Sequence, residues 1–290
     1  MKKKILYGLF LLFLSSMLTA EDVFKEDFPG DFSLNFFLSY NFARFSHDEI
    51  EDTAFYSNRP LDIGIGFGYK KLSLKLSINI PFTHNLNFAK SESIVGQLHY
   101  YGEKMHIEFS LKNYLGMHPS RNSSSSREID LQLLTAGVFS QYIFNHRAHS
   151  LRAAYSLNER QKKSSGSFLV GGSVFYASVL SQDAAIETYS ERKQFIHFGP
   201  NAGYSYSWIF GKDFFLNAFF SLGLHTELEL GSNTVYFSPA VFPSLSFGYH
   251  QEKWSVALSA TSSLLLFRTD GDIHDMLLTC TARLVFVKRF

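Results

Sequence analysis

The densest cluster of polar side chains lies near the middle of the chain and reads Asn158-Glu159-Arg160-Gln161-Lys162-Lys163-Ser164-Ser165-Gly166-Ser167. Cations among serine hydroxyls bind phosphate, sulfate or acidic sugars through charge-assisted hydrogen bonds. The candidate binding residues are Glu159, Arg160, Gln161, Lys162, Lys163, Ser164, Ser165, Ser167 and, just before the cluster, Arg152, with Lys75 as a further contributor. These residue types are compatible with a site for a small polar or anionic solute.

The same cluster has a structural interpretation. Charges at membrane depth are costly unless they face water or bind partners, so the segment either leaves the membrane as a loop or lies inside a lumen. Ion pairs of its cations with Glu159, Glu108 and Asp62 would hold it there as a plug. We favour this structural role over anion recognition.

Motifs for catalysis or metal binding are missing from the sequence. No G-x-S-x-G is present, and Ser164, Ser165 and Ser167 have no His at close spacing. The 11 His residues form neither H-x-H nor H-E-x-x-H, and the lumen-facing candidates His99, His106, His197 and His225 are too dispersed to form a motif. We therefore expect no enzyme, no metal site and no cofactor.

The elements that must position these residues are β-strands. From Leu61 to Tyr69, every second residue is apolar, with Asp62 and three glycines between them. The alternation resumes from Leu72 to Ile80 after Lys70-Lys71, as in two strands joined by a tight turn. Gly64, Gly66 and Gly68 all point inward in this pattern, leaving room on the wall for an inserted segment.

The same period continues along the chain and predicts an antiparallel transmembrane β-barrel of about 12 strands, with ten to fourteen as the permitted range. The expected strands are 32–42, 61–69, 72–80, 94–100, 105–111, 129–144, one crossing within 150–180, 196–208, 214–224, 241–249, 254–260 and 276–290. Residues 151–157 also alternate. The second face is mostly Ser, Asn, Gly and Thr, which suits a polar, partly filled lumen better than the solvent face of a β-sandwich.

Connections of two lengths alternate along the chain. Short turns follow positions 70, 102, 145, 211 and 250, and longer polar loops are expected at 46–59, 84–93, 120–127, 181–193, 227–234 and 268–274. Outer-membrane barrels have short periplasmic turns and longer external loops, so both termini are expected in the periplasm. The final strand ends at Phe290, an aromatic end that resembles the signal read by the barrel-assembly machinery.

The N-terminus and the composition agree with this location. Residues 1–20 form a basic start, an apolar run and a small-residue end, typical of a signal peptide, and residues 21–290 form the barrel domain. The 31 Phe and 15 Tyr suit lipid-facing surfaces and aromatic girdles. A net charge of +1 argues against nucleic acid as a partner and leaves outer-membrane lipids and a small solute.

Two blocks resemble a known family. The run from His149 to Leu169, containing Ala153-Ala154-Tyr155 and Asn158-Glu159-Arg160, resembles the central signature of the family catalogued as domain of unknown function 4421. The stretch Arg59-Pro60-Leu61 through Gly68-Tyr69-Lys70 is similar to the family's earlier motif. The resemblance implies an outer-membrane barrel of a diderm bacterium and no known activity.

The sequence thus predicts an integral outer-membrane barrel that passes or binds a small polar or anionic solute. The alternatives are a structural or surface-interaction barrel with a plugged lumen and, with less support, an outer-membrane lipid hydrolase. A hydrolase would need a Ser–His or carboxylate pair that only the fold brings together.

Overall fold

The computed structural model describes residues 24–47, 54–58, 61–83, 91–119, 131–181, 192–232, 235–269 and 272–290. The predicted signal peptide at 1–20 lies outside these residues, as do most of the predicted long loops. In the described part of the chain, no helix is both long enough and apolar enough to cross a membrane.

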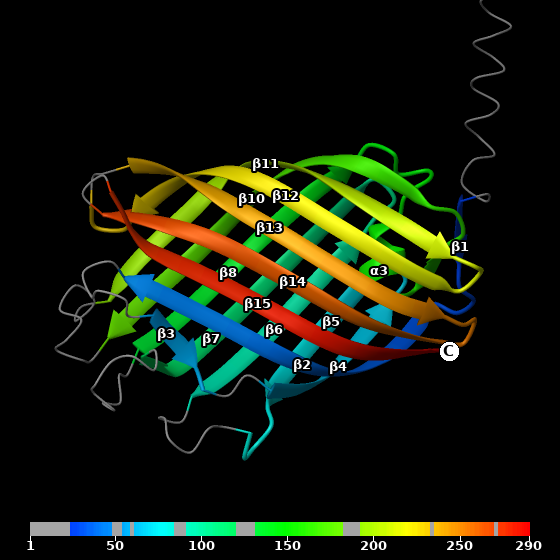
Figure 1. The fold of residues 1–290 in the computed structure, drawn as a ribbon, viewed down its shortest axis with the longest axis horizontal. Helices are drawn as coiled ribbons and strands as arrows, with labels where there is room; N and C mark the ends of the chain where they lie inside the picture. Colours follow the sequence, from blue (N-terminus) through cyan, green and yellow to red (C-terminus); the bar gives the residue numbers. More distant parts are fainter. Residues whose placement is uncertain are drawn as a thin grey trace, which may run out of the picture.

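A closed antiparallel barrel accounts for nearly all of the described residues (Figure 1). Its wall consists of β2 (Phe32–His47), β4 (Leu61–Tyr69), β5 (Leu72–Asn79), β6 (Glu92–Tyr101), β7 (Met105–Pro119), β8 (Leu131–Ile143), β10 (Ser165–Ser181), β11 (Lys193–Phe210), β12 (Phe214–Glu229), β13 (Val235–His250), β14 (Trp254–Thr269) and β15 (Asp272–Arg289). Pairing of β15 with β2 closes the ring, with Leu284 opposite Leu38. The predicted count of twelve strands is confirmed for the described residues.

Apolar side chains cover the outer wall. Phe36, Ile63, Leu258 and Leu284 each expose about half of their surface, and their strand neighbours point inward. Each wall strand pairs with a neighbour on both sides, so the ring has no open edge, as a lipid environment requires. Aromatic pairs gather at the short-turn end, including Trp254 with Phe286 and others on neighbouring strands. This surface is that of a transmembrane barrel with an aromatic girdle.

The strands run further than the sequence suggests. The predicted loop at 227–234 is wrong at its start, because β12 continues to Glu229. The predicted loop at 268–274 is mostly strand, and the loop predicted at 46–59 contains β3 (Ala54–Ser57), which pairs with β2 and β7. A polar residue such as Glu227 suggests a loop in the sequence, but its side chain faces inward and is fully buried, so the strand continues through it.

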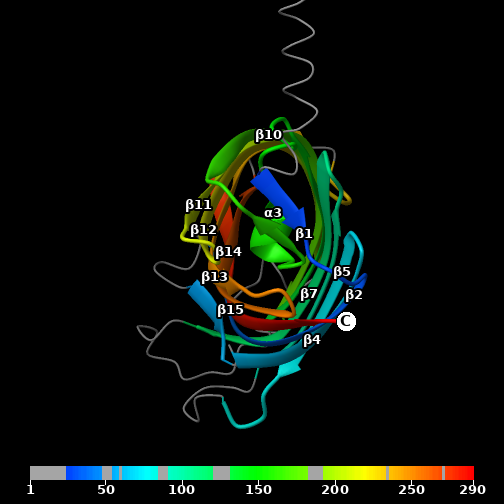
Figure 2. The ribbon, with the colours of Figure 1, turned by 90° about the vertical axis from the view of Figure 1, so that its right-hand side faces the viewer.

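The chain leaves the wall between β8 and β10. We call residues 144–164 the plug. The plug contains α3 (Leu151–Tyr155) and β9 (Glu159–Gln161), and β9 pairs with β1 (Lys25–Asp27) near the N-terminus. Seen from the short-turn end, α3 lies inside the ring of strands (Figure 2). The prediction that residues 150–180 cross the membrane once is therefore confirmed. The polar cluster lies at the end of the barrel where the plug is.

A helix replaces the expected alternation at 151–157. Ser150 caps it by accepting a hydrogen bond of 3.0 Å from the Ala153 amide, and the segment is rich in good helix formers. A helix this short is marginal in water. The wall stabilises it, because Lys75 Nζ donates to the Tyr155 carbonyl over 3.1 Å and Ser246 Oγ donates to the Ala154 carbonyl over 2.8 Å.

The glycines of β4 make room mainly for β2 and less for the plug. A Cβ at Gly64 would clash with the Phe37 ring, and a Cβ at Gly66 would lie 3.0 Å from Asn35 Nδ2. At Gly68 a Cβ would lie 2.7 Å from Asn158 Nδ2 of the plug. The prediction that an inserted segment packs on this row thus holds at Gly68 and is wrong at the other two positions.

Candidate functional site

The two arginines of the predicted site already form ion pairs. Arg152 forms an ion pair of 2.6 Å with Asp27 and donates to the Lys70 carbonyl over 3.0 Å. Arg160 lies 3.3 Å from Asp213 and 3.9 Å from Glu26. The expected partners Glu108 and Asp62 are wrong, because both lie on wall strands away from the plug's rim, whereas β1 and the turn after β11 bring other carboxylates there.

Glu159 and Gln161 hold the plug together from inside. The Glu159 carboxylate accepts a hydrogen bond from the Ser150 hydroxyl, and burial raises its pKa above the usual value. The Gln161 side chain accepts from the Ser150 amide over 3.0 Å and donates to the Ala148 carbonyl over 2.5 Å and to Ser165 Oγ over 3.1 Å. These bonds tie β9 to the segment before α3.

The remaining predicted residues fasten the plug's exit into β10. Lys162 and Lys163 are exposed, and the Lys163 ammonium lies 5.5 Å from the Phe24 ring. Ser164 Oγ accepts from the Ile209 amide over 2.9 Å, and Ser167 Oγ accepts from the Asn145 amide over 2.9 Å. The predicted residues therefore take part in several separate contacts of the plug and do not form one pocket. Arg152 and Glu159 share a rim cavity of about 110 Å³, where charges of both signs meet.

A different set of residues encloses a cavity inside the barrel. We call this cavity, of about 130 Å³, the luminal chamber. Its charged and strongly polar lining consists of Lys75, Gln97, His99, His106, Glu108, Lys112 and Arg283 from β5, β6, β7 and β15. Phe139, Phe175, Phe219 and Phe242 line it from β8, β10, β12 and β13, and Leu151 and Tyr155 of α3 form its plug side.

The polar wall of the chamber carries more positive than negative charge. Arg283 donates to Gln97 Oε1 over 2.8 Å and lies over the Phe37 ring, and Gln97 Nε2 donates to Glu108 over 3.2 Å. Lys112 Nζ donates to Thr279 Oγ1 over 3.1 Å. Among the lining residues, three cations face the single carboxylate of Glu108. The nearby carboxylate of Asp62 accepts hydrogen bonds from Asn41 and Asn79 at 2.5 and 2.6 Å and also acts electrostatically on Arg283.

Two of the chamber's histidines are neighbours, which the sequence analysis missed. His99 Nδ1 lies 3.4 Å from His106 Nε2 and 3.7 Å from Glu108 Oε2. The expectation that the histidines are too dispersed is wrong for this pair. The register of the β6–β7 hairpin, which sets His99 opposite Glu108, brings them together. The predicted turn at Gly102 already implies this register.

His99, His106 and Glu108 are spaced as in a metal site, but the side chains around them are positively charged. All three ligand atoms lie within 4.8 Å of one another, and two His with one carboxylate is a known zinc ligand set. Lys75, Lys112 and Arg283 all act electrostatically on Glu108. A divalent cation would add charge beside these three cations at low dielectric. The chamber therefore suits an anion better than a metal ion.

A second histidine forms a Ser–His pair deeper in the wall. His225 Nε2 lies 2.8 Å from Ser173 Oγ, and Asn201 Nδ2 also donates to this oxygen over 3.3 Å. Nucleophilic catalysis needs a third group that orients the imidazole. Within the described residues, His225 Nδ1 is buried without a hydrogen-bond partner. The pair therefore lacks the carboxylate of a hydrolase triad.

Apolar side chains close the end of the lumen where the longer connections lie. We call this group the apolar seal; it consists of Phe45, Phe55, Met117, Leu131, Leu133 and Phe195, each at most 1% exposed. They come from the loop ends of β2, β3, β7, β8 and β11. The partly filled lumen was expected, but part of its filling is apolar, which alternation with Ser and Asn does not predict.

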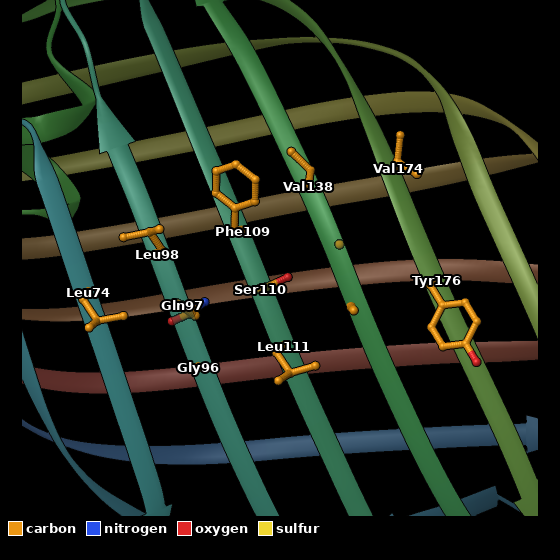
Figure 3. A pocket seen from close by; sticks show the side chains of 12 residues that line it. Leu74, Gly96, Gln97, Leu98, Phe109, Ser110, Leu111, Val138, Val174 and Tyr176 are labelled. Atoms are coloured by element: carbon orange, nitrogen blue, oxygen red, sulfur yellow. The ribbon is translucent and has the colours of Figure 1, made fainter.

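The outer wall has a shallow depression of about 490 Å³ (Figure 3). Leu74, Phe109, Leu111 and Val174 border it, on the face that lipid covers. Its lining is almost entirely apolar. The depression suits hydrocarbon and offers nothing to a polar solute, so the candidate site remains the luminal chamber.

A family model described as "Domain of unknown function (DUF4421)" matches residues 22–290. The chain belongs to this family. The resemblance found in the blocks at 59–70 and 149–169 is thereby confirmed. The description of DUF4421 states no activity, and no curated protein matches the sequence.

Solved structures similar to this DUF4421 barrel are outer-membrane proteins. OmpT of Vibrio cholerae is 8% identical, with a TM-score of 0.32 over 88% of this chain and 98% of that one. A bacterial polysaccharide outer membrane secretin is 10% identical, with a TM-score of 0.38 over 89% and 98%. The toluene transporter TodX of P. putida is 8% identical, with a TM-score of 0.28 over 92% and 90%. TM-scores this low do not indicate a shared function. The assignment as an outer-membrane barrel rests on the closed strand order and the apolar outer wall.

Proposed function

We propose that this protein is a closed outer-membrane barrel that binds a small polar or anionic solute in the luminal chamber. The observation that carries the proposal is the charge of the chamber, where Lys75, Lys112 and Arg283 face one carboxylate. Glu108 offsets only part of the charge of these three cations, an excess of buried positive charge is costly, and a bound anion would supply the balance.

Binding is better supported than free passage. The plug occupies one end of the lumen and the apolar seal fills the other. A solute that reaches the chamber would enter past the plug, because many of the plug's contacts are hydrogen bonds and ion pairs, whereas the seal is a fully buried apolar cluster. Passage across the membrane would require both to move.

Planar-bilayer recording of the refolded mature protein tests the closed state. We expect no steady conductance from the unaltered barrel. Regular open steps that change ion preference when Lys112 is replaced by Met would contradict a closed chamber and support a pore.

Thiol labelling tests the route of entry. Thr261 lines the chamber, so a Thr261→Cys variant in a Cys280→Ser background reports access to it. Replacing residues 146–164 by a short Gly-Ser connection should speed labelling by a small charged reagent at least about tenfold. A decrease of about 1.4 kcal/mol in the free energy of opening the chamber is enough for a tenfold increase. Lys212→Cys, on an exposed turn, is the matched control and should label rapidly in both barrels. Equal rates at Thr261→Cys would refute entry past the plug.

The alternative of a structural barrel with a plugged lumen is favoured by one observation, the complete burial of the apolar seal. It predicts that no small anion binds. We propose no enzymatic role, because the Ser173–His225 pair has no orienting carboxylate among the described residues.

We also propose that both termini face the periplasm, with Phe290 presented to the barrel-assembly machinery and the outer wall to outer-membrane lipids. The short turns at 70–71, 102–104, 211–213 and 251–253 share an end with β1 and Phe290, which supports this orientation. In intact cells, a membrane-impermeant reagent should then fail to label Lys212→Cys. Labelling without outer-membrane permeabilisation would reverse the orientation.

A further inference from the structure

We infer that the luminal chamber binds a small organic carboxylate with an apolar, preferably aromatic, body. This inference rests on the proposed binding function and names its ligand class. The carboxylate would lie at Lys112, Lys75 and Arg283, and the body against the phenylalanine wall. The predicted anion site at residues 159–167 is a different place, at the rim.

The cations retain unused donors. An ammonium has three N–H groups, and among the described residues each lysine donates one hydrogen bond, Lys75 to the Tyr155 carbonyl and Lys112 to Thr279 Oγ1. Arg283 Nε is buried without a partner there. A carboxylate accepts up to about four hydrogen bonds, so one anion could satisfy several of these groups together.

The opposite wall suits a ring rather than an inorganic ion. Phe139 lies 5.0 Å from Phe242 and 6.3 Å from Phe219 between ring centroids, and Phe175 lies 5.8 Å from Phe242. These centroid distances are those at which aromatic rings attract one another. Phosphate or sulfate would leave this wall without a complementary partner, whereas a ring would extend the cluster.

The chamber has the size of a small ring compound. Its volume is about 130 Å³, and a dry apolar cavity of roughly 150 Å³ holds benzene. A benzoate-sized anion fills such a space after small side-chain adjustments. Acetate would leave much of it empty, and a sugar acid would exceed it.

Equilibrium dialysis of the refolded full-length mature barrel in detergent tests the inference, with long incubation so that slow entry does not limit binding. The probes are benzoate, its neutral isostere benzamide, acetate and inorganic phosphate. We expect benzoate to bind about tenfold or more tightly than each of the other three, because one charged hydrogen bond or one buried ring is worth at least this factor.

Two chamber variants separate the two halves of the site. Lys112→Met should weaken benzoate about tenfold and leave benzamide unchanged, and Phe242→Leu should weaken benzoate and leave acetate unchanged. Lys212→Met, an exposed lysine outside the chamber, is the matched control and should bind benzoate normally. Heat-modified mobility in gels confirms that each variant is folded.

Three results would overturn the inference: no benzoate binding at millimolar concentration, equal binding of benzoate and benzamide, or tighter binding of phosphate or acetate than of benzoate. The last would leave the proposed anion-binding function intact and refute the aromatic ligand class. Absence of binding by all four probes, with Thr261→Cys still labelled past the plug, would refute this ligand class while keeping solute access.

Discussion

The two ends of this lumen are closed by different forces. The apolar seal consists of wall side chains such as Phe45 and Leu133 that are fully removed from solvent. The plug also buries Leu151 and Leu157, but it is held in addition by hydrogen bonds from Lys75, Ser246 and Arg289 to backbone carbonyls of α3 and the residues after it. Polar contacts exchange readily with water, whereas apolar burial does not. We therefore expect the plug end to open before the seal end.

The largest expected effect is a difference in the free energy of unfolding between a variant of the seal and a variant of the plug. Leu133→Ala in the seal should lower the free energy of unfolding by about 2–5 kcal/mol, because the cavity it leaves is enclosed by packed neighbours. Ser246→Ala at the plug should cost about 1 kcal/mol, the value of one hydrogen bond. Denaturant titration followed by heat-modified gel mobility measures both. A smaller effect of Leu133→Ala than of Ser246→Ala would mean that the seal is not a packed core.

The second largest expected effect is a pH dependence of plug docking. Burial lowers the pKa of His149 to about 4, with a smaller contribution of the same sign from Lys25. The docked plug therefore binds fewer protons than the released plug between pH 4 and the usual value of 6.5. Acidification through this window should weaken docking by up to about 3 kcal/mol.

Glu159 works in the opposite direction. Its pKa is raised chiefly by burial, so docking is favoured while the carboxyl is protonated and is weakened as pH rises through the raised pKa. In Glu159→Gln, hydrogen exchange at α3 should accelerate on acidification, and in His149→Gln it should slow. Exchange at the seal should change in neither variant. If exchange at α3 changed with pH in the same direction in both variants, His149 and Glu159 would not be the cause of the pH dependence of docking.

The glycine row provides a smaller test of how the plug meets the wall. Gly68→Ala places a methyl group against Ser33 Oγ of β2 and against Asn158 of the plug, and overpacking of this kind costs about 1–3 kcal/mol. Asn158→Ala should relieve part of this cost in the double variant. Gly66→Ala, which meets Asn35 and the Leu74 carbonyl instead, is the control and should show no rescue by Asn158→Ala. Equal rescue at both positions would argue against a specific contact at Gly68.

The barrel was predictable because its evidence is local and repeated. Most strands show a period of two, so the fold class follows without knowledge of contacts, and the alternation of short turns and long loops puts the count near twelve. The helix α3 was not predictable, since seven alternating residues fit a strand as well as a helix. The pairing of β1 with β9 joins residues more than 130 positions apart, such as Lys25 and Gln161, and no local pattern indicates it.

The chamber could be predicted only in part. His99 and Glu108 face each other across a hairpin whose turn was predicted, so the register alone would have found them. Lys112 and Arg283 become neighbours only when β15 closes on β2, and the tilt and stagger of the closed ring decide which residues share a depth. The rim cluster at 159–167 attracted attention because its charges are adjacent in sequence, whereas the chamber's charges are adjacent only in the fold.

The smallest expected effect is at the rim ion pair between Arg152 and Asp27. Asp27 is 71% exposed, and exposed pairs of this kind contribute about 0.2–1 kcal/mol. Asp27→Asn removes the charge and keeps the bond from Arg152 to the Lys70 carbonyl, so proteolysis near β1 should increase slightly at low salt and be unchanged at high salt. A salt-independent loss of more than about 2 kcal/mol would mean that the rim, rather than the hydrogen bonds at α3, holds the plug. The plug would then open when β1 is released. The two ends would differ because ion pairs hold the plug and apolar burial holds the seal.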